Sequence, residues 1–324
     1  MTARWLVVLS LVSACASPGT PARSASPSPT GALPPVTGQA SQVVAKVHTG
    51  GTPCGIVEAF GSVWVTDAQN ATLLRINPRT HAIIGRTPLA GTPCELTTGF
   101  GSLWVATQSG VLQRVDPRSA KVLATIAVGR ASYEPLVAFG SVWVSNRNSS
   151  TVSRINPHTN AVTATVPTPG LLPGGLVEAG GAIWVGNDSG GATALAKLDP
   201  TSLHLTSVMA GSRPSFVTAA AGSVWVASED DGSVTQLDPR TGARRGLPLL
   251  AGVRPVNLAA WRDREVWVPD DQGNLLTRID ASSGAVLERL LVGSGPAVAA
   301  PVGDSVWVSM FGGGEVWQVR PGAH

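Results

Sequence analysis

The stretch Gly61-Ser62-Val63-Trp64-Val65 decides the fold of this chain, because close copies of it recur along most of the sequence. Each copy carries one tryptophan, and these are Trp64, Trp104, Trp143, Trp184, Trp225, Trp267 and Trp307. Successive tryptophans are separated by 40, 39, 41, 41, 42 and 40 residues. Seven copies at a nearly constant period of this length indicate a repeat architecture, in which every copy is one supersecondary unit.

Each repeat divides into four short strands separated by turn signals. In the first unit an apolar run at 55–60 precedes the tryptophan strand, and the third strand ends in Ile76-Asn77-Pro78. Asn or Asp before Pro starts a tight turn, because proline presets the backbone dihedral and the Asx side chain bonds to nearby backbone. A strand rich in Thr, Val and Ile completes the unit, as at 121–128. Four strands at this period predict an all-β fold, a seven-bladed β-propeller.

The two ends of the repeat array predict how the ring closes. The seventh unit stops after its third strand, at 316–321, so it lacks a fourth strand. Residues 41–50 match the last strand of the other units and precede the first complete unit. We therefore expect 41–50 to pair with 315–321 and complete blade seven, which removes two exposed sheet edges. The propeller domain is expected to span 41–324.

The first 40 residues predict an exported, anchored protein. Arg4 precedes an apolar stretch at 5–12 that is too short to span a bilayer and is typical of a signal-peptide core. The next residues, Val12-Ser13-Ala14-Cys15, resemble a bacterial lipobox, in which the cysteine is lipidated after cleavage. An ordinary signal peptide with an incidental cysteine is the alternative. Six prolines among small residues at 16–40 are typical of an extended tether.

These features divide the chain into a signal peptide at 1–14, a tether with a lipidated Cys15 at 15–40, and the propeller. We expect the protein to lie outside the cytoplasm and to contact the cell membrane only through its lipid anchor. The 23 basic and 20 acidic residues leave a net charge of +3, and the sequence contains no basic run. Nucleic acid is therefore not an expected partner, and we expect a monomer.

The repeated Gly-Ser-Val-Trp-Val and Ile-Asn-Pro motifs at 41–321 resemble those of YVTN and streptogramin (virginiamycin) B lyase-like propellers of bacterial envelopes. The resemblance implies the propeller architecture. For the lyase members it also implies opening of a cyclic depsipeptide ester by elimination, with histidine, glutamate and a magnesium ion on one propeller face. Propellers of this kind serve many unrelated roles, so the motifs are specific for the fold and weak for the activity.

The histidines do not fit the lyase chemistry. His81, His158 and His204 all follow an Asx-Pro turn, on the face opposite the loops that join the blades, and His48 lies on the closing strand. We therefore expect a non-catalytic protein with no cofactor that binds a protein partner or a small ligand on its loop face. The alternative is a metal-dependent lyase of the streptogramin B type, or a hydrolase, acting on a lactone or depsipeptide.

Ligand-binding residues are expected where the loops that join blades meet the loops after the tryptophan strands. Asp67, Asn146, Asn187 and Asp270 lie three residues after their tryptophans. Residues next to the loop prolines, or at the matching positions, are Glu95, Tyr133, Glu134, Arg213, Arg254 and Asn257. Together they are predicted to line a funnel on the propeller axis. The alternative for each Asp or Asn alone is a solvated turn, which favours these residue types.

Acidic residues after the tryptophan strands of blades four to six raise the question of a metal. The segments Asn187-Asp188, Glu229-Asp230-Asp231 and Asp270-Asp271 offer oxygen ligands of the kind that calcium prefers. Each segment is followed by a turn glycine, so hairpin chemistry accounts for them equally well. We assign no metal to the site and keep Mg²⁺ or Ca²⁺ as the weaker alternative.

Cys54 and Cys94 are one repeat period apart, so they occupy matching positions in adjacent blades. Sevenfold geometry places their Cα atoms roughly 6–7 Å apart, at the upper end of what a disulfide spans. Export permits oxidation. We therefore predict a Cys54–Cys94 disulfide. The alternative is that two small apolar residues fill a position that holds Gly174, Ser215 and Ala297 in other blades.

Overall fold

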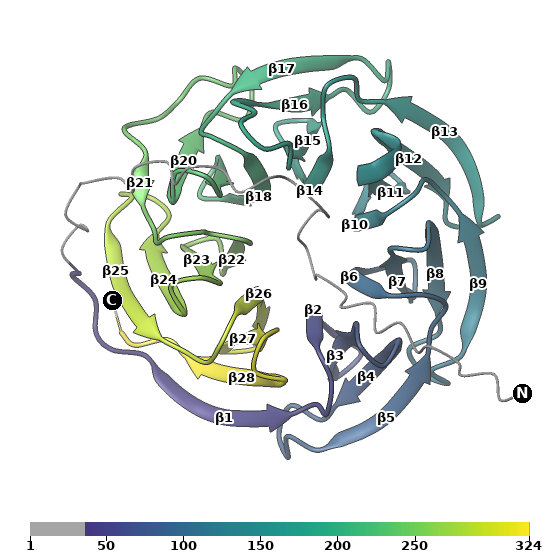
Figure 1. Cartoon of the computed structure of the whole chain (residues 1–324), viewed down its shortest axis with the longest axis horizontal. Coiled ribbons are helices and arrows are strands. Elements are labelled where there is room, and N and C mark those ends of the chain that lie inside the picture. Colours follow the sequence, from purple (N-terminus) through teal and green to yellow (C-terminus); the bar gives the residue numbers. More distant parts are fainter. Residues whose placement is uncertain (1–35, 324) are drawn as a thin grey trace, which may run out of the picture. The chain divides into compact units, whose positions relative to one another are not determined.

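The computed structural model describes residues 36–323, which form a ring of seven four-stranded sheets (Figure 1). Neighbouring strands within these sheets run antiparallel; in blade three, for example, Asn146 of the second strand lies opposite Thr151 of the third. The predicted seven-bladed, all-β propeller is therefore confirmed. The predicted signal peptide, Cys15 and most of the tether lie outside the described residues. Within 36–323 no helix has the length and apolarity needed to cross a membrane.

The first three blades follow one another along the chain, each with its innermost strand first. Blade one contains β2 (Pro53–Ala59), β3 (Ser62–Asp67), β4 (Thr72–Ile76) and β5 (Ile83–Pro88). Blade two contains β6 (Pro93–Gly99), β7 (Ser102–Thr107), β8 (Val111–Val115) and β9 (Val122–Ala127). Blade three contains β10 (Ser132–Ala138), β11 (Ser141–Asn146), a short 3-10 turn η1 (Arg147–Ser149), β12 (Thr151–Asn156) and β13 (Ala161–Pro167).

The remaining blades have the same order of strands. Blade four contains β14 (Pro173–Ala179), β15 (Ala182–Asn187), β16 (Ala194–Leu198) and β17 (Leu205–Met209). Blade five contains β18 (Pro214–Ala220), β19 (Ser223–Ser228), β20 (Ser233–Leu237) and β21 (Leu249–Leu250). Blade six contains β22 (Ala259–Trp261), β23 (Glu265–Asp270), β24 (Leu275–Asp280) and β25 (Val286–Leu291). Blade seven contains β26 (Pro296–Val302), β27 (Ser305–Met310) and β28 (Glu315–Arg320), with β1 (Gln42–His48) outermost.

The repeated tryptophan is the centre of each blade's packing, and all seven are fully buried on the second strand. In blade one the Trp64 indole N–H donates to the Ala59 carbonyl oxygen at 3.1 Å. The Arg75 guanidinium lies 5.2 Å from the centre of the Trp64 ring and donates to Ser62 Oγ. The same contacts recur around Trp104 and Trp143 in the next two blades. In these blades the tryptophan of the second strand thus contacts both the first and the third strand, which explains why the motif is repeated.

The predicted closure is confirmed by the strand pairing. β1 runs antiparallel to β28, with Gln42 opposite Arg320 at one end and His48 opposite Glu315 at the other. Just beyond β1, the Thr49 N–H donates to the Gly314 carbonyl oxygen at 3.0 Å. Figure 1 shows β1 as the outer edge of blade seven, at the end of the row that starts with β26. The strand nearest the N-terminus thus covers the edge that the last repeat leaves open.

Blade six also holds both ends of the propeller. The Ser41 N–H donates to Glu288 Oε1 at 2.7 Å, and the Gly38 N–H donates to the Leu287 carbonyl oxygen at 2.8 Å. At the other end of the chain, Arg278 Nη2 donates to the Gly322 carbonyl oxygen at 2.7 Å. The ring is therefore closed by contacts to two blades, and the contact with blade six was not foreseen from the sequence.

Candidate functional site

A cavity of about 650 Å³ lies on the propeller axis, because inner-strand residues of six blades line it. Three predicted site residues are among them: Glu95 on β6, Glu134 on β10, and Asn257 just before β22. The rest of the lining is largely apolar and includes Leu96 and Leu258. An apolar cavity with a few converging polar groups is the usual form of a small-molecule site. The structure thus brings these three predicted residues together.

Three glutamates line the cavity, and of these Glu58 is exposed whereas Glu95 and Glu134 are less accessible to solvent. Glu95 is only 4% exposed, and Glu134 is half-buried, with its backbone N–H donating to Ser145 Oγ at 3.0 Å. Burial raises the pKa of Glu134 from its ordinary 4.5 to about 8, because desolvation disfavours the charged carboxylate. Glu134 is therefore largely protonated at neutral pH and can donate a hydrogen bond or a proton inside the cavity.

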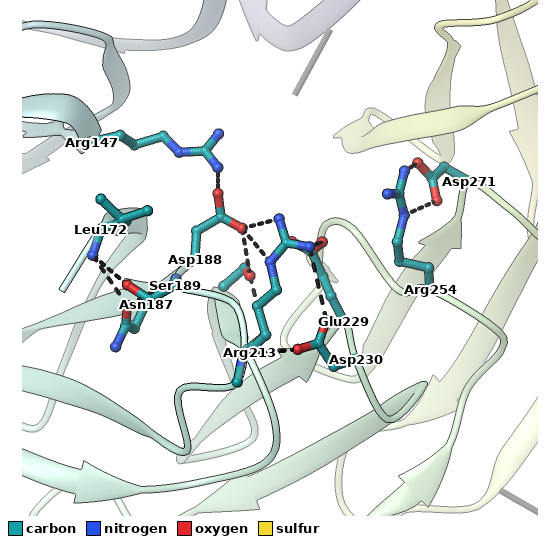
Figure 2. A network of polar contacts seen from close by, with 12 residues as sticks. Arg147, Leu172, Asn187, Asp188, Ser189, Arg213, Glu229, Asp230, Arg254 and Asp271 are labelled. Carbon is teal, nitrogen blue, oxygen red and sulfur yellow. Dashed lines mark hydrogen bonds and ion pairs between the residues drawn. The ribbon is translucent and has the colours of Figure 1, made fainter. Parts of the chain in front are cut away.

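A network of charged side chains lies on the loop face, which is the face where the inner strands begin (Figure 2). At its centre is Arg213, whose Nη2 lies 2.6 Å from Asp188 Oδ1 and whose Nη1 lies 3.1 Å from Glu229 Oε2. Arg147 also pairs with Asp188, from the opposite side (Figure 2). A separate pair, Arg254 with Asp271, completes what we call the loop-face network. Its members are Arg147, Asp188, Arg213, Glu229, Arg254 and Asp271.

The arginines of this network act on the buried carboxylate of Glu229. Glu229 is 6% exposed, and burial raises its pKa. Arg213 opposes that shift most strongly, followed by a hydrogen bond from Ser215 and by the charges of Arg254 and Arg147. Arg213 itself has a backbone φ of +54°, in the left-handed region that non-glycine residues rarely adopt. Strained backbone is concentrated at functional sites, and here it carries the arginine that joins two buried carboxylates.

Aromatic rings lie beside the charges. The predicted site residue Tyr133 is 4% exposed, and its ring centre lies 6.0 Å from that of Phe216. The Arg147 guanidinium lies 5.0 Å from the centre of the Tyr133 ring. Blade four has Gly174 and Gly175 at the matching positions of its inner strand, between the blades that carry the two rings. The loop face therefore combines apolar rings with guanidinium and carboxylate groups.

Four predicted residues lie apart from the network. Asp67, Asn146, Asn187 and Asp270 are each at most 3% exposed and are used by their own hairpins and loops. Asp270 Oδ1, for instance, accepts from the N–H groups of Arg254 and Gly273. Asp67 Oδ1 accepts from the Thr52 N–H in the matching loop of blade one. These contacts fit the turn interpretation.

Sequence reasoning placed Arg213 and Arg254 at the site and considered Asp188, Glu229 and Asp271 only as metal ligands, and it did not name Arg147. Arg147, Asp188, Glu229 and Asp271 lie four residues after their tryptophans, whereas the prediction took the third residue. The backbone N–H of this fourth residue donates to the loop that leads into the inner strand, as from Asp188 to Leu172 at 2.8 Å. Charged residues at this position in four consecutive blades were the available signal. Of the predicted set, Arg213 and Arg254 belong to this network, Tyr133 contacts Arg147, and Asp270 accepts from the backbone N–H of Arg254.

The acidic segments of blades four to six are explained by arginines. Asp188, Glu229 and Asp271 each pair with a guanidinium. Asp231 accepts from the N–H groups of Ser212 and Ser233, as expected of a hairpin residue. The Asp231 contacts agree with the hairpin interpretation of the segments, and the ion pairs were not foreseen from the sequence.

The cysteine pair lies at the loop-face end of two neighbouring inner strands. Cys54 on β2 and Cys94 on β6 are each 2% exposed, and their Sγ atoms lie 2.9 Å apart. This separation places the sulfurs in contact, but it exceeds the roughly 2.05 Å of an S–S bond. The structure confirms that the two residues meet across blades one and two, and the disulfide itself stays a prediction.

The described histidines lie away from the cavity and the loop-face network. His81 Nε2 lies 2.7 Å from Gln318 Oε1, and its ring lies 5.9 Å from that of Trp307. His158 contacts the ring of Phe100. Both follow the third strand of their blade, at the face opposite the loop face, as predicted. No histidine of 36–323 is among the residues that line the axial cavity.

Comparison with solved structures identifies the fold. The chain is similar to virginiamycin B lyase from Staphylococcus aureus, with a TM-score of 0.76 and 16% identity over 85% of this chain and 98% of the lyase. A catalytically inactive histidine-to-alanine variant of that enzyme, solved with quinupristin, gives a TM-score of 0.75 at 16% identity over 87% and 98%. The fold is thus a propeller of the virginiamycin B lyase-like type.

The same comparison shows how little the fold says about activity. Hydrazine synthase of Kuenenia stuttgartiensis matches with a TM-score of 0.74 and 15% identity over 84% of this chain and 96% of that one. Proteins of unrelated chemistry are therefore about equally similar, as expected of a widely used architecture. No protein-family model and no curated protein sequence matches this chain.

Proposed function

We propose that this protein is a non-catalytic, lipid-anchored propeller outside the cytoplasm that binds a small ligand, or a peptide segment of a partner, at its loop face. The observation that carries the proposal is the loop-face network beside the Tyr133–Phe216 rings. Guanidinium and carboxylate groups alternate there, and the arginines are partly open to solvent, with Arg147 15% and Arg213 18% exposed, beside the buried Asp188 and Glu229. Such a surface complements a ligand that carries both charges next to an apolar group.

Arginine and aromatic side chains support recognition for physical reasons. They are enriched at the energetic centres of binding sites, because each gives a large contact area with few rotatable bonds lost per contact. The axial cavity contributes a second feature, since protonated Glu134 can donate a hydrogen bond to a group that reaches into it. The lipid anchor is supported by the Val12-Ser13-Ala14-Cys15 motif alone.

The competing function is a lyase acting on a cyclic depsipeptide. It is favoured by the fold similarity to virginiamycin B lyase and by a glutamate whose pKa of about 8 suits proton transfer near neutral pH. Against it, the similar enzyme is described as inactive when a histidine is replaced by alanine. The described histidines of this chain lie at the opposite face or on the closing strand.

One experiment separates the two functions. Purified protein is incubated with quinupristin and Mg²⁺, and the products are followed by mass spectrometry, while a thermal-shift screen covers dipeptides and small aromatic carboxylates. We expect no ring-opened product and at least one stabilising ligand. Arg213→Ala should abolish that ligand's shift, and Arg79→Ala, an exposed arginine on the opposite face, should not. Ring opening that is lost in Glu134→Gln would overturn the proposal in favour of the lyase.

A further inference from the structure

Cys54 and Cys94 share their corner of the inner ring with a third potential metal ligand. The two sulfur atoms and a carboxylate oxygen of Glu95 all lie within 4.8 Å of one another, and all three residues are buried. They come from matching ends of adjacent inner strands, β2 and β6. Five blades have Tyr133, Gly174, Ser215, Val256 and Ala297 at the cysteine position. The sulfurs are therefore confined to blades one and two, where Glu95 directly follows Cys94.

The backbone of blade one is shaped to admit this carboxylate. Gly55 follows Cys54, and a Cβ atom on Gly55 would lie 2.9 Å from Glu95 Oε2 and 2.6 Å from the Cys94 carbonyl oxygen. Both distances are shorter than real Cβ contacts allow, so a side chain at position 55 would displace one of these groups. Glu95 also lines the axial cavity, which links the cluster to a space that a small ion or water can reach.

We propose that the reduced Cys54–Cys94 pair and Glu95 form a binding site for a thiophilic divalent cation such as Zn²⁺. Thiolate sulfur and carboxylate oxygen are both zinc ligands, and in a site with three protein ligands the fourth position is filled by water. Zn–S and Zn–O distances of about 2.3 and 2.0 Å put ligand atoms of a tetrahedral site roughly 3.3–3.8 Å apart. The sulfurs, now 2.9 Å apart, need to separate by less than about 1 Å.

The electrostatics of the site favour such an ion. A divalent cation brings positive charge beside a buried carboxylate, which lowers the cost of burying that charge. It also displaces the protons of both thiols, since the thiolate is the form that binds metal. The predicted disulfide uses the same two sulfurs, so disulfide and metal site are alternative states of one pair. The metal site shares no residue with the loop-face network, and it adjoins the axial cavity through Glu95.

Cobalt is the probe for the test. The protein in a Cys15→Ser background, kept reduced with a phosphine, is titrated with Co²⁺ under nitrogen. We expect one ion per chain, with a thiolate-to-cobalt charge-transfer band and the visible bands of tetrahedral cobalt, both removed by Zn²⁺. Cys54→Ser and Cys94→Ser should each weaken cobalt binding at least about 100-fold, because each removes a direct ligand. Loss of a residue that only hydrogen-bonds to a ligand weakens metal binding about 10- to 100-fold. Glu95→Gln should weaken it about 10-fold or more and keep the sulfur band.

Controls make the result decisive. Denatured samples are titrated for thiols, and two per chain confirm that both sulfurs are reduced. Diamide, an azo oxidant that takes two electrons and two protons from the pair and leaves an S–S bond, should abolish cobalt binding. The proposal is overturned if reduced protein shows no charge-transfer band, or if the band survives in Cys94→Ser. It is equally overturned if the sulfurs stay bonded in excess reductant.

Discussion

The ammonium group of Lys46 lies 3.7 Å from the centre of the Trp317 ring, and the two residues are opposite each other in the pairing of β1 with β28. Trp317 is 8% exposed, and its indole N–H donates to Glu315 Oε2 at 2.8 Å. A cation over an aromatic face contributes about 0.5–1 kcal/mol at an exposed position. The contact therefore reinforces the strand pair that joins the two ends of the propeller.

A chain that begins at residue 51 should be much less stable than one that begins at residue 36. The shorter chain lacks β1, so the edge of β28 becomes available for pairing with other molecules. We expect a loss of roughly 3 kcal/mol or more in the free energy of unfolding, together with aggregation. Urea titration and light scattering measure both. Equal stability of the two chains would show that β1 adds nothing to closure.

Breaking the buried ion pair of blade six should be costly. Arg278 is 1% and Glu265 0% exposed at their side chains, with Arg278 Nη2 2.6 Å from Glu265 Oε1. Glu265→Gln leaves a buried guanidinium without its counter-charge, and such changes cost about 3–5 kcal/mol. Arg75→Met is the matched control, because Arg75 is half-buried and its partner is the neutral Ser62. If the control lost as much stability as Glu265→Gln, the buried charge would not be the cause.

Stability should fall as the pH rises from about 5 to about 8, in part because of Glu134. Its pKa is about 8 in the folded protein against an ordinary 4.5, so the folded state keeps a proton that the unfolded chain releases. The contribution of Glu134 to the free energy of unfolding is therefore fully present below pH 4.5, and it decreases as the pH rises toward 8 and is lost above it. Glu134→Gln should make the free energy of unfolding fall less steeply with pH, by about 1 kcal/mol per pH unit between pH 5 and pH 8. Unfolding by urea at pH 5, 6.5 and 8 tests it, and identical slopes for both proteins would contradict it.

Gly55→Ala should destabilise the protein, whereas Gly85→Ala should not. A Cβ at position 55 meets the Cys94 carbonyl oxygen at 2.6 Å, and backbone cannot yield cheaply. At position 85 the nearest atom is Arg75 Cβ at an ordinary 3.5 Å. We expect a loss of about 1–3 kcal/mol for Gly55→Ala and a change of about zero or a small gain for Gly85→Ala. Thermal unfolding compares the two, and equal melting temperatures would refute the steric argument.

Oxidation should join Cys54 to Cys94. The bond would close a loop of 40 residues, which stabilises by about 4 kcal/mol in the chain-entropy account, less any strain. Mass spectrometry of unreduced, alkylated protein detects the bond, and the reduced form of the same protein gives the comparison for stability. Two alkylated thiols at positions 54 and 94 in protein isolated under oxidising conditions would contradict this prediction.

The fold and its closure followed from the sequence by itself, because they depend on local and periodic information. A tryptophan every 39–42 residues and an Asx-Pro turn in most units define the blades and their number. The displaced strand at 41–50 defines where the ring closes. The pairing of Cys54 with Cys94 was accessible for the same reason, since one repeat period places residues at matching points of adjacent blades. Glu95, Glu134 and Asn257 were expected on the inner ring in the same way, from their place after a loop proline or, for Glu134, after the matching Ser132, and all three line the axial cavity.

The charged network was decided only by the tertiary structure. Adjacent residues at the end of a strand take different roles: Asp270 accepts from backbone N–H groups of Arg254 and Gly273, whereas Asp271 pairs with the Arg254 guanidinium. Whether Asp188 and Glu229 bind a cation or an arginine depends on where Arg147 and Arg213 lie, because the partners of Asp188 come from other blades. The raised pKa of Glu134 likewise arises from burial in a cavity lined by six blades, which no local pattern encodes.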